Sequence, residues 1–297
     1  MIQIKTFFDS VSSTFTHVVH DPKTNQCAVI DSVLGYDQYS GLTNTQAADE
    51  VMNYIIESGL NIEWLLETHI HADHISGAKY IQSKMGGKIG LGERIKDVLE
   101  LWVPLFNTGH DTPVDASQFD VLFKDGQSFQ IGTVEVKVMF TPGHTPACAC
   151  YLVEDAVFVG DTVFMPDIGT ARTDFPGGCS ASMYDSVRKI LSLPEDTRIF
   201  LCHDYPPPGR EKPVSHVTVR EQRQANVMVR DGIGRNEYIN MRTIRDMGKA
   251  VPKMLLPSIQ VNLRAGTFGA AQNNQIKYIK IPVDCLDKVA KEKKSGC

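Results

Sequence analysis

The chain has 297 residues, of which 42% are hydrophobic and 22% charged, an ordinary globular composition with enough length to bury a core. Its formal net charge of −5, from 30 basic and 35 acidic residues, argues against broad binding to nucleic acid. No stretch approaches the roughly 20 apolar residues of a membrane span. The seven irregularly spaced cysteines do not form a disulfide framework, and no signal peptide is evident. We therefore expect a cytoplasmic protein that binds neither nucleic acid nor membranes.

The first third of the chain is typical of short strands with two helices. Residues 14–20 and 27–32 are rich in β-branched and aromatic residues and flank the polar cluster 21–25, which predicts a hairpin. Apolar residues at helical spacing follow at 47–57 and 75–84. The expected strands are 3–8, 14–20, 27–32 and 62–66.

The rest of the chain continues this alternation. Strands are expected at 118–123, 128–131, 133–140, 147–153, 156–160 and 198–202, and a helix at 184–191. Two charged helices are expected within 217–247, with a break at 231–234. Strands interleaved twice with helices predict two packed sheets with helices outside, in a single domain over 1–286. The charged residues 287–297 are expected to be a disordered tail.

A cluster of three histidines and an aspartate dominates the sequence. The segment His69-Ile70-His71-Ala72-Asp73-His74 follows an apolar strand and precedes a helix. Loops at strand ends commonly carry chemistry. Three imidazoles and a carboxylate in six residues favour a divalent first-row metal.

Three later segments repeat the same arrangement, an apolar strand followed by a polar ligand type. They end in His144 of Gly143-His144-Thr145, Asp161 of Gly160-Asp161-Thr162, and His203 of His203-Asp204-Tyr205. Four such strand ends in series predict that these side chains converge on one site.

The remaining histidines and the cysteine pair have simpler interpretations. A surface or structural role is expected for His17, His20, His110 and His216. Cys148 and Cys150 are expected to be buried as small apolar residues.

The order HxHxDH, GHT, GDT and a strand-end histidine resembles the metallo-β-lactamase superfamily over roughly residues 3–205. This resemblance implies an αββα sandwich of two mixed β-sheets flanked by helices, with the metals at one edge of the sheets. It also implies a first metal on His69, His71 and His144, and a second on Asp73, His74 and His203, with Asp161 bridging. Such a set predicts a two-zinc hydrolase, of which hydroxyacylglutathione hydrolase (glyoxalase II) is the nearest.

Three further segments resemble the persulfide dioxygenases, over nearly the whole chain up to about Pro282. They are residues 169–178, His203-Asp204-Tyr205 and 261–266, and the residues flanking Arg172 look like those of bacterial members. The resemblance implies one iron(II) per chain, held by His69, His144 and Asp161. Two histidines and a carboxylate leave three positions open for the persulfide sulfur and dioxygen. The residues His71, Asp73, His74 and His203 then orient ligands and solvent, or hold a second metal in the hydrolase alternative.

The reaction that this resemblance implies is oxidation of glutathione persulfide by O2 to sulfite and glutathione. Arg172 is expected to bind a carboxylate of the substrate through its planar fork, with an ion pair to Asp174 as the alternative. Tyr205 is expected to bind substrate and to act as a catalytic hydrogen-bond donor. Two roles are considered for Arg264, substrate binding and pinning of the C-terminal segment, of which the structural role is favoured. A homodimer is a family expectation.

Two other functions stay open. The first is a hydroxyacylglutathione hydrolase with two Zn²⁺ ions. Its support is a set of arginines within 217–247, whose alternative role is simply to lie on a solvent-exposed face: Arg220, Arg223, Arg230, Arg235, Arg242 and Arg245. A non-catalytic, metal-stabilised binding module is the second, and the complete ligand set argues against it.

Overall fold

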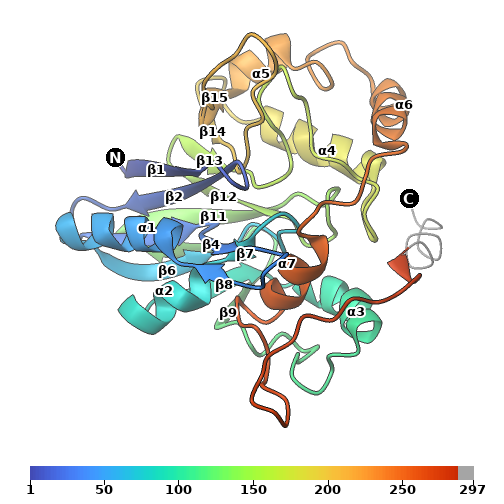
Figure 1. The fold of residues 1–297 in the computed structure, drawn as a ribbon. Coiled ribbons are helices and arrows are strands. Elements are labelled where there is room, and N and C mark those ends of the chain that lie inside the picture. Colours follow the sequence, from blue (N-terminus) through green and yellow to red (C-terminus); the bar gives the residue numbers. More distant parts are fainter. Residues whose placement is uncertain (287–297) are drawn as a thin grey trace.

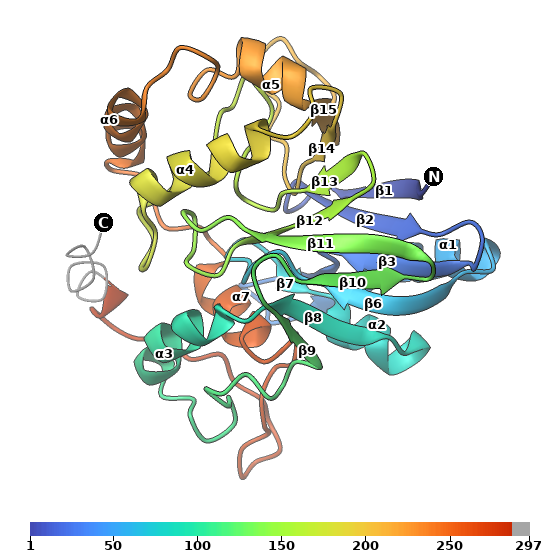
Figure 2. The same cartoon turned by 180° about the vertical axis from the view of Figure 1, so that it is seen from behind.

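Two six-stranded mixed β-sheets pack face to face in the computed structural model, which describes residues 1–286 (Figures 1 and 2). The first sheet has the order β1 (Gln3–Asp9), β2 (Thr14–His20), β3 (Gln26–Ile30), β6 (Asn61–Leu66), β8 (Lys88–Gly92) and β9 (Val121–Phe123). The second has the order β10 (Ser128–Ile131), β11 (Val134–Phe140), β12 (Ala149–Val153), β13 (Ala156–Phe158), β14 (Arg198–Phe200) and β15 (His216–Thr218). A small third sheet joins β5 (Thr43–Asn44), β4 (Val33–Tyr36) and β7 (Ile75–Ser76).

Helices cover the outer face of each sheet (Figure 1). On the side of the first sheet lie α1 (Gln46–Glu57), α2 (Ala78–Met85), α3 (Ile95–Phe106) and α7 (Leu255–Asn262). On the side of the second lie α4 (Ser180–Leu191), α5 (Val219–Ala225) and α6 (Arg235–Asp246). The predicted αββα architecture is thereby confirmed.

Alternation along the strands divides the core into layers. Leu65 packs among the residues beneath α1, α2 and α3, whereas its neighbour Leu66 packs between the two sheets. Val18 and Val19 of β2 divide in the same way. Because successive side chains of a strand point to opposite faces, continuous apolar runs such as these are typical of strands buried on both sides.

Most expected elements are present, and the β2–β3 hairpin is confirmed. The helix expected at 75–84 begins instead at Ala78, because Ile75 and Ser76 pair with β4. The helices α3 and α7 were not expected; α3 contains an internal proline, Pro104, and α7 has Pro257 in its first turn. The predicted tail 287–297 lies outside the described residues. No helix among residues 1–286 has both the length and the apolar character needed to cross a membrane.

Candidate metal centre

Four loops that follow strands supply the side chains of the centre. The loop after β6 carries His69, His71, Asp73 and His74, and the loops after β11, β13 and β14 carry His144, Asp161 and His203. The two sheets meet here, through an isolated bridge between Thr14 of β2 and His203. The structure brings all seven predicted side chains together at this edge.

The seven side chains form two adjacent groups. The ligand atoms of His69, His144 and Asp161 lie within 4.8 Å of one another, as do those of a second group, His71, Asp73, His74 and His203. The Nε2 atom of His203 is 3.4 Å from Asp161 Oδ1, so the groups adjoin. This division separates the residues predicted to hold a single iron from those predicted to orient ligands or to hold a second metal.

Unpaired polar atoms indicate that the centre is built for a cation. Six buried side-chain atoms of the set have no hydrogen-bond partner within residues 1–286: His69 Nε2, His71 Nδ1, Asp73 Oδ2, His74 Nε2, Asp161 Oδ1 and His203 Nε2. Burying such atoms without partners is costly. Imidazole nitrogens and carboxylate oxygens are ligands of divalent first-row metals, so these residues fit a metal site.

Backbone carbonyls fix the ring orientation of two histidines. The Nδ1 atom of His144 lies 2.8 Å from the carbonyl oxygen of Arg172, and Nδ1 of His203 lies 3.2 Å from that of Ser13. Because a carbonyl only accepts hydrogen bonds, each Nδ1 carries the proton. The Nε2 lone pair of each ring is therefore free for a metal.

A short relay orients His69 in the same way. The hydroxyl of Thr68 donates to Asp31 Oδ2 over 2.8 Å, and it lies 3.0 Å from Nδ1 of His69. Since its proton is already committed to Asp31, the hydroxyl accepts from Nδ1–H and leaves Nε2 bare. Burial, together with neighbouring His71 and His144, lowers the pKa of His69 well below its usual value, which favours the neutral ring that binds metals.

His71 stands in a different electrostatic setting. Its Nε2 atom lies 3.0 Å from both Asp31 Oδ1 and Glu67 Oε2. Burial alone lowers the pKa of His71, but these two carboxylates outweigh it and raise the pKa well above the usual value. The hydroxyl of Ser76 donates to the other oxygen of Glu67 and holds that carboxylate in place. His71 therefore keeps its Nε2 proton more firmly than a free imidazole does.

Asn262 of α7 holds the ligand loop by its backbone, a role that was not predicted from the sequence. Its Nδ2 atom donates to the carbonyl oxygens of His71 and His74, each over 2.9 Å. Its Oδ1 atom accepts from the Ser76 amide over 2.8 Å. The side chain is buried, with 3% exposure, so water does not replace these bonds. The segment 261–266 pointed to this region, but nothing local indicated its target.

The two residues predicted to contact substrate, Tyr205 and Arg172, differ in whether their polar groups are already bound to other side chains. Tyr205 is 43% exposed beside the centre, and its ring stacks on His203 with centroids 5.7 Å apart. Burial of the hydroxyl, with Asp73 and Asp161 nearby, raises the pKa of Tyr205, so the phenol stays protonated and able to donate. The guanidinium of Arg172, in contrast, is held by Asp174 through bonds of 2.6 and 2.7 Å. The ion pair given above as the alternative for Arg172 is thus the observed arrangement.

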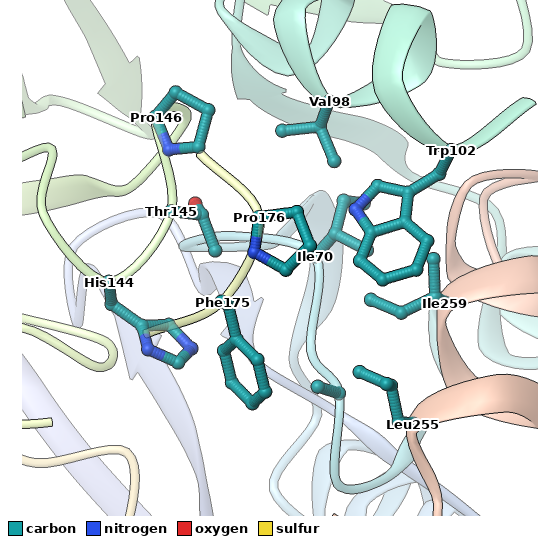
Figure 3. A pocket seen from close by; sticks show the side chains of 11 residues that line it. Ile70, Val98, Trp102, His144, Thr145, Pro146, Phe175, Pro176, Leu255 and Ile259 are labelled. Carbon is teal, nitrogen blue, oxygen red and sulfur yellow. The ribbon is translucent and has the colours of Figure 1, made fainter. Parts of the chain in front are cut away.

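Apolar side chains close one flank of the centre (Figure 3). The Phe175 ring lies edge-on to His144, with centroids 5.3 Å apart. Behind them is a small cavity of about 20 Å³, where side chains of α3, such as Trp102, face Ile259 of α7. A larger cavity of about 300 Å³ adjoins Asp73, His144 and Asp161 and gives room for a substrate. Tyr205 and Arg172 are also among its lining residues.

The other residues discussed in the sequence analysis are not part of the metal centre. His17 is buried, with Nδ1 2.9 Å from the Thr6 hydroxyl and Nε2 2.9 Å from the Leu201 carbonyl oxygen, a structural role as expected. Burial lowers its pKa to about 4. Cys148 and Cys150 are buried, as expected. Arg264 pairs with Asp111 at 2.9 Å, which fits the structural role.

The fold and the site together define a metal-binding protein of the αββα class, with its ligands on loops at one edge of two sheets. The family model described as the metallo-beta-lactamase superfamily matches residues 11–203, and the chain belongs to that superfamily.

The relatives of this chain include a protein named as a glyoxylase and others named as persulfide dioxygenases. The chain is 47% identical to "Glyoxylase B2" of Dictyostelium discoideum, over 96% of this chain and 98% of that protein. It is 28% identical to the mitochondrial persulfide dioxygenase ETHE1 of Homo sapiens, over 89% of each chain. Among solved structures, ETHE1 from Myxococcus xanthus matches with a TM-score of 0.71 and 26% identity, over 89% of this chain and all of that one.

Proposed function

We propose that this protein is a non-haem iron(II) persulfide dioxygenase that oxidises glutathione persulfide with O2. The observation that carries the proposal is the separate group of His69, His144 and Asp161, two imidazoles and one carboxylate. That donor set is typical of non-haem iron(II) oxygenases. Similarity to persulfide dioxygenases, in sequence and in fold, supports the same conclusion.

The proposed reaction is balanced as glutathione persulfide plus O2 plus water giving glutathione, sulfite and two protons. The outer sulfur gives up four electrons, O2 takes them up, and the sulfur–sulfur bond breaks. Iron(II), when bound, supplies the means to bring dioxygen and the sulfur into reaction. His69, His144 and Asp161 would hold one such ion per chain, and the larger cavity adjoins two of these residues, His144 and Asp161.

The surrounding residues orient the ligands and meet the substrate. His144 and His69 donate their Nδ1–H groups to the Arg172 carbonyl oxygen and to the Thr68 hydroxyl, which leaves their Nε2 atoms bare and aimed at the centre. Tyr205 is the proposed hydrogen-bond donor to the reacting group, because its phenol stays protonated and lines the same cavity. The apolar flank formed by Phe175 limits the approach of water from that side.

A dizinc hydroxyacylglutathione hydrolase is the second candidate, and a specific observation favours it. The group of His71, Asp73, His74 and His203 adjoins the first group and has enough donors for another metal. The relative named Glyoxylase B2, at 47% identity, keeps this function in view.

The test compares the two reactions on the same protein loaded with either of the two metals. Protein loaded anaerobically with iron(II), and protein loaded with zinc, are each assayed for O2 uptake on glutathione persulfide and for hydrolysis of S-lactoylglutathione. We expect O2 uptake from the iron form with about one iron per chain, the count that one facial triad predicts. Hydrolysis by a form with about two zinc ions per chain, without O2 uptake by the iron form, would refute the proposal.

A further inference from the structure

A groove of about 1180 Å³ reaches the metal centre beside the larger cavity. It is lined by the end of β1, by β4 and the residues 37–42 that follow it, and by the first turns of α1. The groove and the cavity share Asp73, Tyr205 and Pro252, whereas their other lining residues differ. The centre therefore has two approaches, and the groove has about four times the volume of the cavity.

The inner end of the groove is a wall of the metal centre. His74 lines the groove and is only 3% exposed, and its Nε2 atom has no hydrogen-bond partner among residues 1–286. Tyr205, the proposed hydrogen-bond donor, lines both approaches. A group that enters along the groove can therefore reach the same reacting position as one that enters through the cavity.

The outer part of the groove carries a surplus of negative charge. Its lining includes Asp9, Asp37 and Glu50 against a single basic residue, Lys253. None of the three carboxylates has an ion-pair partner among residues 1–286, and Asp37 and Glu50 are exposed. A ligand with positive charge is therefore attracted into the groove, and a polyanion such as nucleic acid is repelled from it.

Exposed aromatic and apolar side chains lie among these acids. Tyr39 is 88% exposed, Val11 92% and Leu42 69%, and all three line the groove. Phe8 and Tyr36 contribute two further rings to the lining. Lysine and arginine suit such a surface, because their stems pack on apolar groups and rings while their charged ends meet carboxylates. A peptide segment with several basic residues therefore fits both the charge and the size of the groove.

We infer that the groove binds a basic segment of another protein, and that a persulfidated cysteine within that segment places its outer sulfur at the metal centre. The inference rests on the proposed function for its chemistry. Protein persulfide, O2 and water give protein thiol, sulfite and two protons. The sulfur–sulfur bond breaks, the outer sulfur gives up four electrons, and O2 takes them up. Glutathione persulfide and a protein persulfide would thus reach one centre by different approaches.

The test uses two short synthetic peptides, each with a central cysteine, which is flanked by lysines in one peptide and by glutamates in the other. Calorimetry under anaerobic conditions measures binding of their thiol forms to the iron-loaded protein, at an ionic strength of about 0.1 M, where charges more than about 10 Å apart are largely screened. O2 uptake measures the reaction of their persulfidated forms and of glutathione persulfide.

The groove variant combines Asp37→Asn with Glu50→Gln, which removes two charges and keeps the polarity of both side chains. The matched control combines Glu57→Gln with Glu100→Gln, which removes two exposed acids that do not line the groove. Glu57 lies on α1 like Glu50, about 10 Å further along the helix. Thermal unfolding checks that both variants fold.

We expect the wild type to bind the basic peptide about tenfold more tightly than the acidic one, because each exposed ion pair contributes a modest free energy and several add up. The groove variant should lose most of this preference. Its ratio of kcat/KM for the persulfidated basic peptide to kcat/KM for glutathione persulfide should fall by a similar factor. The control variant should keep both the preference and the ratio.

The inference is overturned if the wild type binds the two peptides equally or binds neither. Retention of the preference by the groove variant, or its equal loss from the control, also overturns it. So does oxidation of glutathione persulfide without oxidation of the persulfidated basic peptide. If neither persulfide is oxidised while the groove variant alone loses the binding preference, the proposed function is refuted and the peptide-binding groove stands.

Discussion

Replacing Asn262 with alanine should loosen the metal-ligand loop without touching any ligand. The change removes two hydrogen bonds to the carbonyls of His71 and His74 and one from the amide of Ser76. Two of these backbone groups belong to the loop that carries four of the seven candidate ligands, and the third, Ser76, lies in β7 directly after that loop. The loss therefore acts on the position of the ligands rather than on their chemistry.

The magnitude follows from the number of bonds and from burial. A net contribution of about 1 kcal/mol for each buried hydrogen bond gives a loss of about 3 kcal/mol in the free energy of unfolding. Removing partners that orient metal ligands typically weakens metal binding about 10- to 100-fold. Asn262→Ala should show both effects.

Gln260 on the same helix is a closely matched control. It is also buried, and it makes three bonds: to the carbonyls of Leu256 and Lys280, and from the amide of Lys280. Gln260→Ala should lose a similar free energy of unfolding but keep its affinity for metal, because none of these groups belongs to the ligand loop.

The assay pairs urea unfolding of the metal-free proteins with a zinc competition titration against a chromophoric chelator. Equal weakening of zinc binding in the Asn262→Ala and Gln260→Ala variants would show that general destabilisation, not loop position, sets the affinity. An Asn262→Ala protein that binds zinc within about twofold of the wild type would refute the positioning role, since the expected range begins at about tenfold.

Three further predictions concern the ligands and the buried charges. His144→Ala should lose iron and activity together, whereas His203→Ala should retain iron by metal analysis; loss of iron from both would contradict the single-iron assignment. For His17, the folded pKa of about 4 lies below the usual 6.5, so the unfolded chain takes up the proton first and stability falls as pH drops through that window. Between pH 7.5 and 5.5 the metal-free wild type should lose about 1.4 kcal/mol more than His17→Gln in urea unfolding, and equal slopes would refute this. Asp246→Ala leaves the buried Arg242 guanidinium unpaired and should cost about 3–5 kcal/mol in the same assay, whereas a cost below about 1 kcal/mol would contradict a desolvated pair.

Local patterns predicted the sheets and the identity of the clustered side chains. The apolar strand before His69 and the strand ends before His144 and Asp161 are short-range signals, and burial on both faces makes such strands easy to recognise. The helix α3 carries buried residues at helical spacing, among them Val98 and Trp102, so its pattern was available in the sequence. The helix α7 is short and buried at nearly every position, so it shows little amphipathic pattern.

Contacts between distant segments were beyond the reach of the sequence. Asn262 and Ser76 are separated by 186 positions, and no spacing rule relates them. The ion pair of Arg172 with Asp174, which occupies the guanidinium expected to bind substrate, likewise emerges only in the structure. Sequence patterns identify which side chains a site contains, whereas the ion pairs and hydrogen bonds of the folded chain decide which of them can contact a ligand.

The most direct test of the proposed function is the ratio of O2 consumed to sulfite formed by the iron-loaded protein on glutathione persulfide. An oxygen electrode and a sulfite assay on the same sample give both quantities. Persulfide dioxygenation requires a ratio of about one, because all four electrons from the outer sulfur pass to a single O2, and the same preparation should not hydrolyse S-lactoylglutathione. No O2 uptake, accompanied by rapid thioester hydrolysis, would contradict the account.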